Sequence, residues 1–596
     1  MKNRLSVLAA LAMNSSMLAG AALADPMANM PGMAAPAAPA PATAPPPATG
    51  AMPGMAPMLM IGPMPSVYAG EADKPGAPVF EGLGAHQHPI STHSTQTQMF
   101  FNQGVNLMFG FNHAEAIRSF REAARLDPDC AMCWWGVAMA LGPNINLPMP
   151  PDAVAPAMAA LGKAQALKDK ASPEERAWIE ALAARYSADL KADRHALDEA
   201  FAAAMGALWK AHPDDLDAGV FYAEAMMDTQ PWDYWQLDGH TPKGHALDIV
   251  ATLETVIKRD PENPGALHLY IHALEATDHP ERAEAAADEL EKLMPGAGHI
   301  VHMPSHIYYR VGRYADAERV NEQAALVDEA YIAACKAQGY YPAGYYGHNI
   351  HFLWTSAEMA GRYQTAIDAA RRLVKAVDAF NLAAQLPSAE LYAFTPMATL
   401  VRFEKWDAVL AEPPPPKTLT LDRAVDLYAR GTAYAAKGDV KDAQAQRAAL
   451  DAVIAASDFS RYDAANVPAK QLATLALDLL DGEIARAQGD LDGAVTHFRA
   501  AYDLQLSLPY TEPPWWHQPV SHVLGAALLQ AKRPTEAEAI YRESLKSYRD
   551  DGWALFGLAQ ALDAQGKTAD AADVRGQFQA AWTRADVKLT SSRSPA

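Results

Sequence analysis

The sequence predicts an all-α protein, a right-handed superhelical solenoid of stacked helix-turn-helix repeats. Three observations lead to this prediction. The chain of 596 residues is too long for one core, since a domain usually takes about 100 to 200 residues. Alanine is abundant and runs of β-branched residues are scarce, which favours helices over strands. From about Gln98 onward, amphipathic segments alternate with short breaks, and one short pattern returns several times.

Residues 1–24 have the layout of a cleavable signal peptide. Lys2 and Arg4 precede the apolar run LSVLAALAM, and a small-residue stretch ends at Ala24. This layout predicts export, so the protein is expected to be periplasmic or secreted. No later segment has the 18 uninterrupted apolar residues that predict a membrane span.

Residues 25–84 are rich in proline, alanine and methionine and are predicted to form a disordered tether, because they cannot bury a core. Thioether groups on a flexible chain are soft ligands that suit Cu(I). A linker of biased composition, with no role in metal binding, is the other interpretation. The methionines form two clusters: Met27, Met30, Met33, Met52, Met55, Met58, Met60 and Met64.

A repeat array is predicted over residues 85–582, followed by a disordered tail at 583–596. Its signature is a fixed spacing from glycine to alanine. The stretch GRYADA at 312–317 returns as GRYQTA at 361–366, and the spacing recurs at Gly438/Ala443, Gly489/Ala494 and Gly566/Ala571.

This pattern resembles the tetratricopeptide repeat (TPR), whose period of about 34 residues carries one helix pair. The likeness covers roughly residues 98–582, or about eleven helix pairs. It implies that the helix pairs stack into a right-handed superhelix and that the first helix of each pair lines a concave groove.

Seven histidines fall on the groove face of three consecutive repeats. The resemblance implies that positions 2, 5, 9, 12 and 13 of each first helix point into the groove. Setting Pro213, Pro261 and Pro295 at position 32 fixes the register. Histidine is only 19 of the 596 residues, so its concentration in the groove (residues 217–358) needs an explanation. The groove histidines are His268, His272, His299, His302, His306, His348 and His351.

A shared transition metal ion accounts for such a group. Protonated imidazoles would repel one another, and buried neutral imidazoles would need partners for both ring nitrogens. Neutral imidazole is a common metal ligand, and pairs spaced i,i+3 or i,i+4 on a helix can chelate one ion. The tether methionines favour copper, with zinc or iron as further possibilities. A substrate site without metal and structural packing are the two alternatives.

Carboxylates accompany the histidines in the same register. Glu275 and Glu358 occupy position 12 and are predicted to accept imidazole N–H groups. Glu224, with Asp217 and Asp228 on the same face, is the candidate base if a metal activates water or dioxygen. No recognised catalytic motif is present, so a metal-dependent hydrolase or oxidoreductase is compatible with the sequence but not required by it.

Pro304 interrupts the spacing of the groove histidines. It lies between His302 and His306, and proline inside a helix removes a hydrogen bond and clashes with the preceding turn. A helix that begins at Pro304 would leave His299 and His302 on an entering loop, with a less predictable direction.

Other segments carry candidate groups. Cys130 and Cys133 form a C-x-x-C pattern that predicts a local disulfide, with a soft-metal pair or ordinary packing as alternatives. The aromatic segment 229–245 is either a lid on the groove or a cover for apolar surface. Further histidines that could add ligands, or lie in a linker or a late repeat, are His86, His88, His93 and His522.

The predicted function is an exported repeat protein that binds a transition metal through its groove, in metal handling or as a metalloenzyme. The alternative is a periplasmic scaffold that holds an envelope protein or peptide in the groove, the usual role of proteins of this kind. The formal charge of -21 argues against a nucleic-acid surface, which would need a basic stripe.

Overall fold

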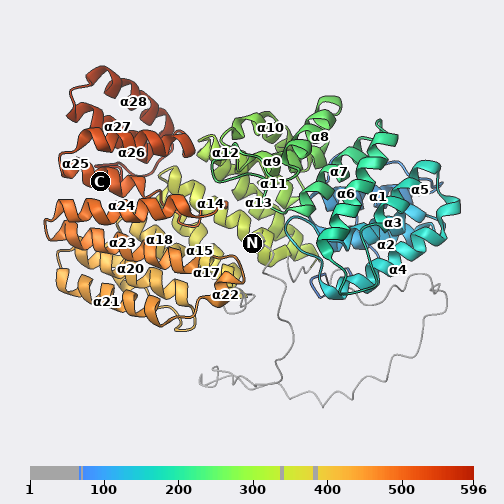
Figure 1. Ribbon diagram of the computed structural model, residues 1–596, viewed down its shortest axis with the longest axis horizontal. Helices are drawn as coiled ribbons and strands as arrows, with labels where there is room; N and C mark the ends of the chain where they lie inside the picture. Colours follow the sequence, from blue (N-terminus) through green and yellow to red (C-terminus); the bar gives the residue numbers. More distant parts are fainter. Residues whose placement is uncertain (1–65, 69–71, 336–340, 380–386, 596) are drawn as a thin grey trace, which may run out of the picture.

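The computed structural model describes residues 66–68, 72–335, 341–379 and 387–595 (Figure 1). The predicted signal peptide and all eight tether methionines lie outside the described residues. Within them the chain forms helices and isolated β-bridges, but no strand. Figure 1 shows the helices following one another along an elongated array, which confirms the predicted all-α solenoid. None of the described helices is long and apolar enough to cross a membrane.

The first part of the array contains helices of 10 to 18 residues that pack in consecutive order. They are α1 (Thr95–Phe109), α2 (His113–Leu126), α3 (Ala131–Ala140), α4 (Val154–Ala166), α5 (Pro173–Ala183), α6 (Arg194–Ala211), α7 (Leu216–Thr229) and α8 (Ala246–Arg259).

The middle part carries the predicted groove histidines. Its helices are α9 (Pro264–Leu274), α10 (Glu284–Leu293), α11 (Gly298–His302), α12 (Pro304–Arg310), α13 (Tyr314–Cys335), α14 (Gly347–Met359) and α15 (Tyr363–Ala379).

The last part completes the array. Its helices are α17 (Glu390–Ala393), α18 (Thr395–Arg402), α19 (Trp406–Ala411), α20 (Thr420–Ala436), α21 (Val440–Ala456), α22 (Ser460–Asp463), α23 (Ala469–Ala487), α24 (Leu491–Ser507), α25 (Ser521–Gln530), α26 (Pro534–Ser547), α27 (Gly552–Ala564) and α28 (Thr568–Ala581).

The repeated glycine and alanine have the positions that a helix pair requires. The five glycines end the first helix of a pair with φ between 68° and 85°, a left-handed conformation in which a side chain is strained. The alanine five residues later is completely buried, so a larger side chain would hold the two helices of the pair apart. These alanines are Ala317, Ala366, Ala443, Ala494 and Ala571.

The array buries two large apolar clusters. One runs from Tyr68 to Tyr345 and the other from Ala325 to Val574, and both take residues from α13. The groove histidines lie on helices that precede and follow α13 in the chain.

The superhelix brings the last helices back against the middle of the array. Arg549 pairs with Glu281 at 2.9 Å, and the Trp553 indole donates to the Glu358 backbone carbonyl at 3.0 Å. Figure 1 shows the red C-terminal helices beside the green helices of the middle part. This closure places residues from distant repeats near the groove.

The end of the predicted tether packs against the helices instead of being disordered. Ala72 and Leu83 are buried, and the Gly82 carbonyl accepts a hydrogen bond from the Gly296 amide at 2.8 Å. Side chains of α1 bind the segment, because Gln103 donates to the Pro78 carbonyl at 2.8 Å. The segment has no core of its own, but it adds apolar side chains to the core of the array.

The predicted disordered tail is also ordered where it is described. Ser592 is completely buried and donates to the His522 carbonyl at 2.7 Å, while buried Arg593 forms an ion pair with Glu483. Composition alone misjudged this segment, because Ser592 and Arg593 find these partners 70 and 110 residues away in the sequence.

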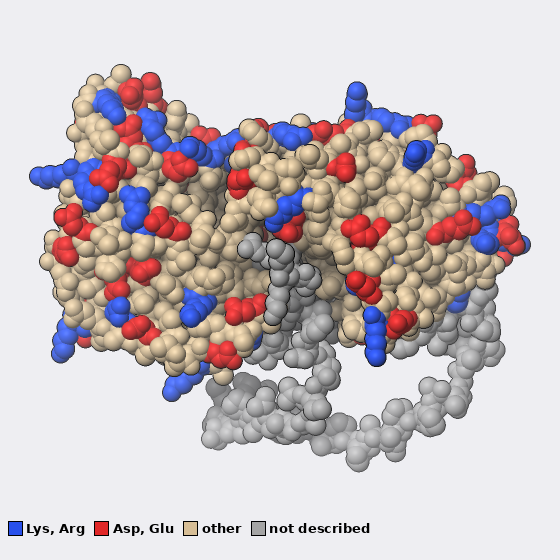
Figure 2. All heavy atoms as spheres, in the orientation of Figure 1, with Lys and Arg blue, Asp and Glu red and all other residues tan. Residues whose placement is uncertain are grey.

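Charged side chains are mixed on the surface. Figure 2 shows lysine and arginine scattered among aspartate and glutamate over the face that it presents, without a basic stripe on that face.

Candidate metal centre

The predicted histidines lie on the first helices of three repeats, which are α9, α11 together with α12, and α14. Helix α12 begins at Pro304, as expected, but the chain does not turn away there. Met303, between α11 and α12, keeps helical dihedral angles of -51° and -39°. His299, His302 and His306 therefore keep their helical spacing and all face the interior, where each is at most 2% exposed.

Three of the histidines form a first trio, defined as His268, His272 and His299. One ring nitrogen of each lies within 4.8 Å of the corresponding nitrogens of the other two. The His268 ring centroid lies 4.8 Å from that of His272 and 5.0 Å from that of His299. All three side chains are buried.

Hydrogen bonds orient the rings of the first trio. His268 Nδ1 lies 2.7 Å from the Phe109 carbonyl oxygen, and His272 Nδ1 lies 2.7 Å from Glu275 Oε1. Both acceptors require the proton on Nδ1, which leaves Nε2 of each ring as a lone-pair donor. These two Nε2 atoms and both ring nitrogens of His299 are buried and have no hydrogen-bond partner among the described residues.

The surroundings keep the first trio neutral. Burial, together with the neighbouring ring His272, lowers the pKa of His268 well below its usual value. Burial and the neighbouring ring His268 likewise lower the pKa of His299. Neutral imidazoles with unpartnered Nε2 atoms are the form that binds transition metals.

The second trio is defined as His302, His306 and His348, and its ligand atoms also lie within 4.8 Å of one another. Here the ring nitrogens of His302 and His306 already have partners. Nε2 of His302 lies 2.9 Å from Nε2 of His306, and Nδ1 of His302 lies 2.6 Å from Asn321 Oδ1. Asn321 uses its Nδ2 group to donate to the Ala317 carbonyl, so its oxygen must accept from His302.

A shared proton accounts for the contact between His302 and His306. His306 Nδ1 faces Glu275 Oε2 at 2.5 Å and Glu512 Oε2 at 3.2 Å. Burial lowers the pKa of His306, but the two carboxylates outweigh it and raise the pKa to about 9. A protonated His306 can donate from Nε2 to the lone pair of His302 Nε2.

Glu275 joins the two trios. Its Oε1 accepts from His272 of the first trio and its Oε2 accepts from His306 of the second. Glu275 is 1% exposed, and these hydrogen bonds hold it as a carboxylate. Its predicted role as an acceptor for imidazole N–H groups is therefore confirmed by the geometry.

His351 and Glu358 do not join either trio. The His351 ring stacks on Trp354, with centroids 5.3 Å apart and an interplanar angle of 11°. Glu358 accepts from a histidine that the sequence did not single out, because His517 Nδ1 lies 2.6 Å from Glu358 Oε2. The structure thus brings six of the seven predicted histidines into two trios and places His351 apart.

A cavity of about 600 Å³ opens beside both trios. His272 and His299 of the first trio and His306 and His348 of the second are part of its wall, and so is His351. A metal ion in the first trio would therefore face a space large enough for a small molecule.

The aromatic loop, residues 230–245, forms one wall of this cavity. The Trp232 ring meets the His272 ring edge-on at 4.9 Å, and the Trp235 indole donates to the Ala273 carbonyl at 2.7 Å. The loop that the sequence offered as a lid or a cover thus lies beside His272 and belongs to the site.

The return segment, residues 508–520, forms another wall. It connects α24 to α25 without helix, and it reaches the groove from more than 200 residues away. The Tyr510 hydroxyl donates to the Glu275 carbonyl at 3.0 Å, and Glu512 and His517 make the contacts described above. The sequence analysis named His522 from this region but missed Glu512 and His517, because nothing local shows that the segment returns to the groove.

The candidate base Glu224 lies elsewhere. It is buried on α7 and is not part of the cavity wall. Burial raises its pKa to about 7. Its neighbour Asp228 forms a buried ion pair with Arg185 at 2.6 Å. These groups stabilise the first part of the array rather than completing the histidine site.

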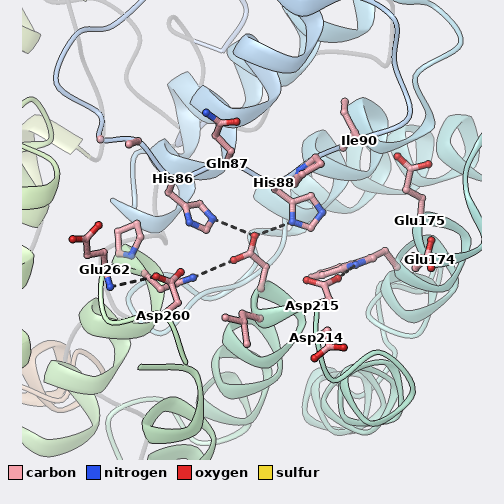
Figure 3. A pocket seen from close by; sticks show the side chains of 18 of the residues that line it. His86, Gln87, His88, Ile90, Glu174, Glu175, Asp214, Asp215, Asp260 and Glu262 are labelled. Carbon is pink, nitrogen blue, oxygen red and sulfur yellow. Dashed lines mark hydrogen bonds and ion pairs between the residues drawn. The ribbon is translucent and has the colours of Figure 1, made fainter. Parts of the chain in front are cut away.

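His86 and His88 form a separate pocket with Asp217, shown in Figure 3. Oδ2 of Asp217 lies 3.1 Å from His86 Nε2 and 2.8 Å from His88 Nδ1. Asn263 donates to the other oxygen of Asp217 at 3.4 Å. These two histidines are thus held by a carboxylate and add no ligand to the groove trios.

The remaining candidates are also accounted for. His522 pairs with Asp551 in the core of the last part, and His93 belongs to none of the groups of potential ligands found among the described residues. Cys130 and Cys133 form a disulfide, as predicted, so they offer no thiolate to a metal.

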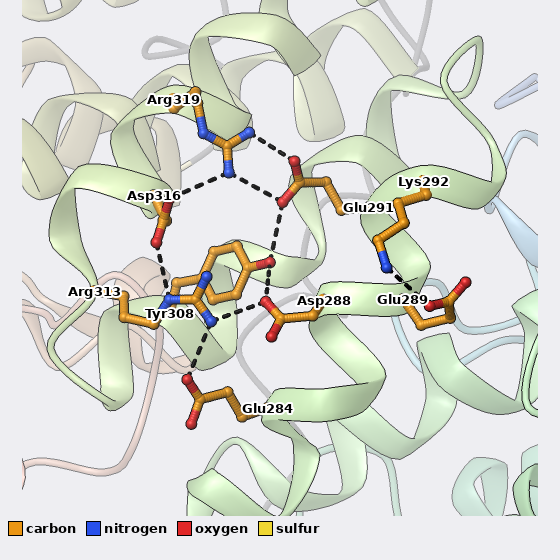
Figure 4. Close-up of polar contacts among 9 residues, drawn as sticks. All are labelled: Glu284, Asp288, Glu289, Glu291, Lys292, Tyr308, Arg313, Asp316 and Arg319. Atoms are coloured by element: carbon orange, nitrogen blue, oxygen red, sulfur yellow. Dashed lines mark hydrogen bonds and ion pairs between the residues drawn. The ribbon is translucent and has the colours of Figure 1, made fainter.

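A surface ion network braces the helix that carries His306 (Figure 4). Arg313 pairs with Asp288 on α10 at 2.8 Å and with Asp316 on α13 at 2.9 Å. Its guanidinium lies 4.1 Å over the ring of Tyr308, which projects from α12 and donates to Asp288. The network fixes α12 between its two neighbours.

Comparisons with known proteins concern the fold alone. The sequence matches no family model and no curated protein. The human IFIT1 dimer with m7Gppp-AAAA aligns over 82% of this chain and 90% of its own, at 12% identity and a TM-score of 0.30. The P58(IPK) TPR domain aligns over 81% and 92%, at 12% identity and a TM-score of 0.19.

The APC/C hetero-tetramer Cut9-Hcn1 aligns over 82% of this chain and 94% of its own, at 13% identity and a TM-score of 0.23. Scores this low carry no argument about function. The stacked helix pairs and their glycine turns are what identify the tetratricopeptide-like solenoid.

Proposed function

We propose that the protein binds a transition metal ion in the first trio, in metal handling or as a metalloenzyme. One observation carries this proposal. His268 and His272 hold their Nδ1 protons against fixed acceptors, while their Nε2 atoms and His299 have no partner. A carbonyl or carboxylate acceptor on Nδ1 is the arrangement that orients histidine ligands in metal sites.

Structural packing explains the first trio less well. A buried polar group without a partner costs about 1 to 3 kcal/mol, and the first trio contains four such nitrogens. If these rings served only to fill the core, apolar side chains could fill the same space without leaving polar nitrogens unpartnered. A bound ion gives one nitrogen of each ring a partner, so it removes the penalty at three of these four nitrogens.

The first trio suits an ion with an open position. Three histidine ligands leave one tetrahedral position free, which is typical of catalytic or exchangeable sites rather than structural ones. His272 and His299 line the cavity, so the free position faces it. Ligand nitrogens in a tetrahedral site lie roughly 3.4 Å apart, so the rings would draw closer than 4.8 Å on binding.

Copper remains the favoured metal, with zinc or iron as alternatives. Imidazole suits all three ions, and the preference for copper comes from the methionines of the tether. In this proposal the exported chain collects Cu(I) on residues 25–65 and holds copper in the first trio.

The alternative function is a scaffold that binds an envelope protein or peptide. The solenoid fold is compatible with it, since such arrays commonly present a concave groove. At the histidines, however, the groove already contains the return segment, whose Tyr510 and Glu512 occupy the place of a peptide. This contact favours the metal proposal for this part of the groove.

Metal retention tests the proposal. Metal-free protein is loaded separately with Cu(II), Zn(II) and Co(II), desalted, and assayed by elemental analysis. We expect one tightly held ion in the wild type and its loss in the His268→Ala/His299→Ala variant. His351→Ala is the matched control, because His351 lines the same cavity outside the trios. Circular dichroism confirms that each variant is folded, and equal retention by all three proteins would refute the proposal.

A further inference from the structure

We infer that the cavity binds an uncharged planar aromatic molecule whose oxygen atom lies at the open metal position. The inference rests on the proposed function for the metal end of the cavity only. For the rest of the cavity, the inference depends only on the residues that form its wall.

Aromatic rings dominate the wall of the cavity. They come from four separate parts of the chain and surround one space: Trp232, Trp235, Tyr345, Trp354, Tyr392 and Trp515. Side chains of this kind bind flat rings by stacking and edge contacts, which add about 0.5 to 1.5 kcal/mol for each pair beyond burial of area. The volume of about 600 Å³ accommodates a molecule of two or three fused rings.

The charges of the wall disfavour an anionic ligand such as a phosphate ester. Among the described residues of the wall, Lys243 is the single lysine or arginine, and it is paired with Asp233. The protonated His306 is paired with Glu275 and Glu512, so the proposed metal ion is the one cation that these residues leave for an anion.

A cationic ligand is disfavoured for a different reason. The carboxylates nearest the trios are already engaged, because Glu275 binds His272 and His306 and Glu512 faces His306. An ion in the first trio would repel a second positive charge. An uncharged molecule is therefore the ligand that the wall fits.

Trp232 points to an oxygen atom on this molecule. Its φ of 62° is a left-handed conformation that bulky residues rarely adopt, so the backbone is strained where it holds the indole beside His272. The indole N–H is buried, and none of the residues that the structure describes offers it a hydrogen-bond acceptor. An oxygen bound at the open metal position, next to His272, would supply that acceptor.

Binding of 2-naphthol and decahydro-2-naphthol tests the inference. The two alcohols match in carbon skeleton, but only the first is planar and aromatic. Titration calorimetry is performed on metal-free and zinc-loaded wild-type protein. We expect 2-naphthol to bind the zinc-loaded protein about tenfold more tightly than the saturated alcohol, as two ring contacts would provide. We also expect zinc to strengthen binding of 2-naphthol.

Trp232→Phe keeps an aromatic ring at the same backbone position and removes the indole N–H together with the five-membered ring. We expect this variant to bind 2-naphthol about five- to tenfold more weakly than the wild type in the presence of zinc, the loss of about one hydrogen bond. Trp209→Phe is the matched control, since the Trp209 indole N–H is also buried without a partner but lies outside the cavity wall.

The outcomes separate the two proposals. Equal affinities for the two alcohols in both forms of the protein would overturn the inference. A preference for 2-naphthol that zinc does not change would reject the placement of the oxygen on the metal. Failure of zinc, Cu(II) and Co(II) alike to bind would contradict the proposed function, while the ring preference would still be measured on the metal-free protein.

Discussion

The two histidine trios are built from the same residue type on adjacent helices, yet they differ in what their nitrogens do. In the first trio, the fixed Nδ1–H groups leave Nε2 of His268 and His272 free. In the second, Nε2 of His302 meets Nε2 of His306 at 2.9 Å. The partners of each ring, rather than the number of histidines, therefore determine which trio is ready for a metal ion.

The carboxylates explain this difference. His306 lies between Glu275 and Glu512, which stabilise its protonated form, and this proton occupies the place where an ion would bind. The first trio contacts only Glu275, through the single hydrogen bond of His272. Glu275 is therefore the group whose removal should affect both trios, whereas Glu512 should affect only the second.

Glu275→Gln should have the largest effect. It removes the carboxylate that binds His306 and orients His272, and breaking a buried ion pair costs about 3 to 5 kcal/mol. We expect the free energy of unfolding to fall by that amount in urea titrations. The affinity of the first trio for zinc should fall about 10- to 100-fold, the usual effect of losing such an orienting group.

Glu254→Gln serves as the control for this variant. Like Glu275, Glu254 contacts two side chains, here a tyrosine and an arginine. It lies at the surface, where such contacts contribute about 0 to 1 kcal/mol. If Glu275→Gln behaved like Glu254→Gln, the two trios would not be coupled through this carboxylate.

Glu512→Gln should affect the second trio and leave the first unchanged. It removes a charge from beside His306 without touching the first trio, so we expect a loss of stability of about 1 to 3 kcal/mol. Zinc affinity, measured by competition with a chelator, should stay within about threefold of the wild type. A large loss of zinc affinity would instead place the ion in the second trio.

The stability of the metal-free protein should depend on pH through the first trio. Burial lowers the pKa of His268 and His299 in the folded state, whereas the unfolded chain binds protons near pH 6.5. The free energy of unfolding is therefore not reduced by these histidines above pH 6.5, and it falls as the pH drops below that value, because the unfolded chain then binds protons that the folded protein does not. Each such histidine contributes a slope of about 1.4 kcal/mol per pH unit.

His299→Gln should reduce this slope by the contribution of one histidine. Urea titrations of both proteins between pH 7 and pH 5.5 measure it. Buried acids such as Glu224, whose pKa is raised to about 7, act in the opposite direction in both proteins and cancel in the difference. Identical slopes would show that His299 is protonated or exposed in solution.

The smallest effect is expected at the surface network. Arg313→Ala removes the ion pairs that brace α12, and exposed networks of this kind contribute about 1 kcal/mol. We expect a loss of that size in the free energy of unfolding, which high salt should diminish in the wild type. Zinc binding should not change, because the network does not contact the first trio.

Much of this architecture follows from the sequence. The glycine spacing and the three prolines set a register that put seven histidines on the groove face, and six of them lie in the two trios. The same register identified Glu275 as an acceptor for imidazole N–H groups. The register relates neighbouring repeats only, so it could not show that Phe109 and Glu512 reach the trios from distant repeats. Those contacts depend on how the superhelix curves, which is set by packing along the whole array.

The repeat register also could not predict the direction of the His351 side chain. A position on the groove face does not fix which neighbour a ring meets, and the flat contact with Trp354 turns His351 away from the trios. Likewise, the composition of residues 72–84 and 583–595 showed that they have no core of their own, but not that the array binds them.

X-ray absorption of the zinc-loaded protein distinguishes a metal ion in the first trio from one in the second. The first trio predicts three imidazole nitrogens at about 2.0 to 2.1 Å and one further light ligand. His299→Ala should lose one imidazole from this shell, whereas His348→Ala should leave it unchanged. A shell that is unaffected by His299→Ala but loses an imidazole in His348→Ala would contradict the account, because the ion would then lie in the second trio.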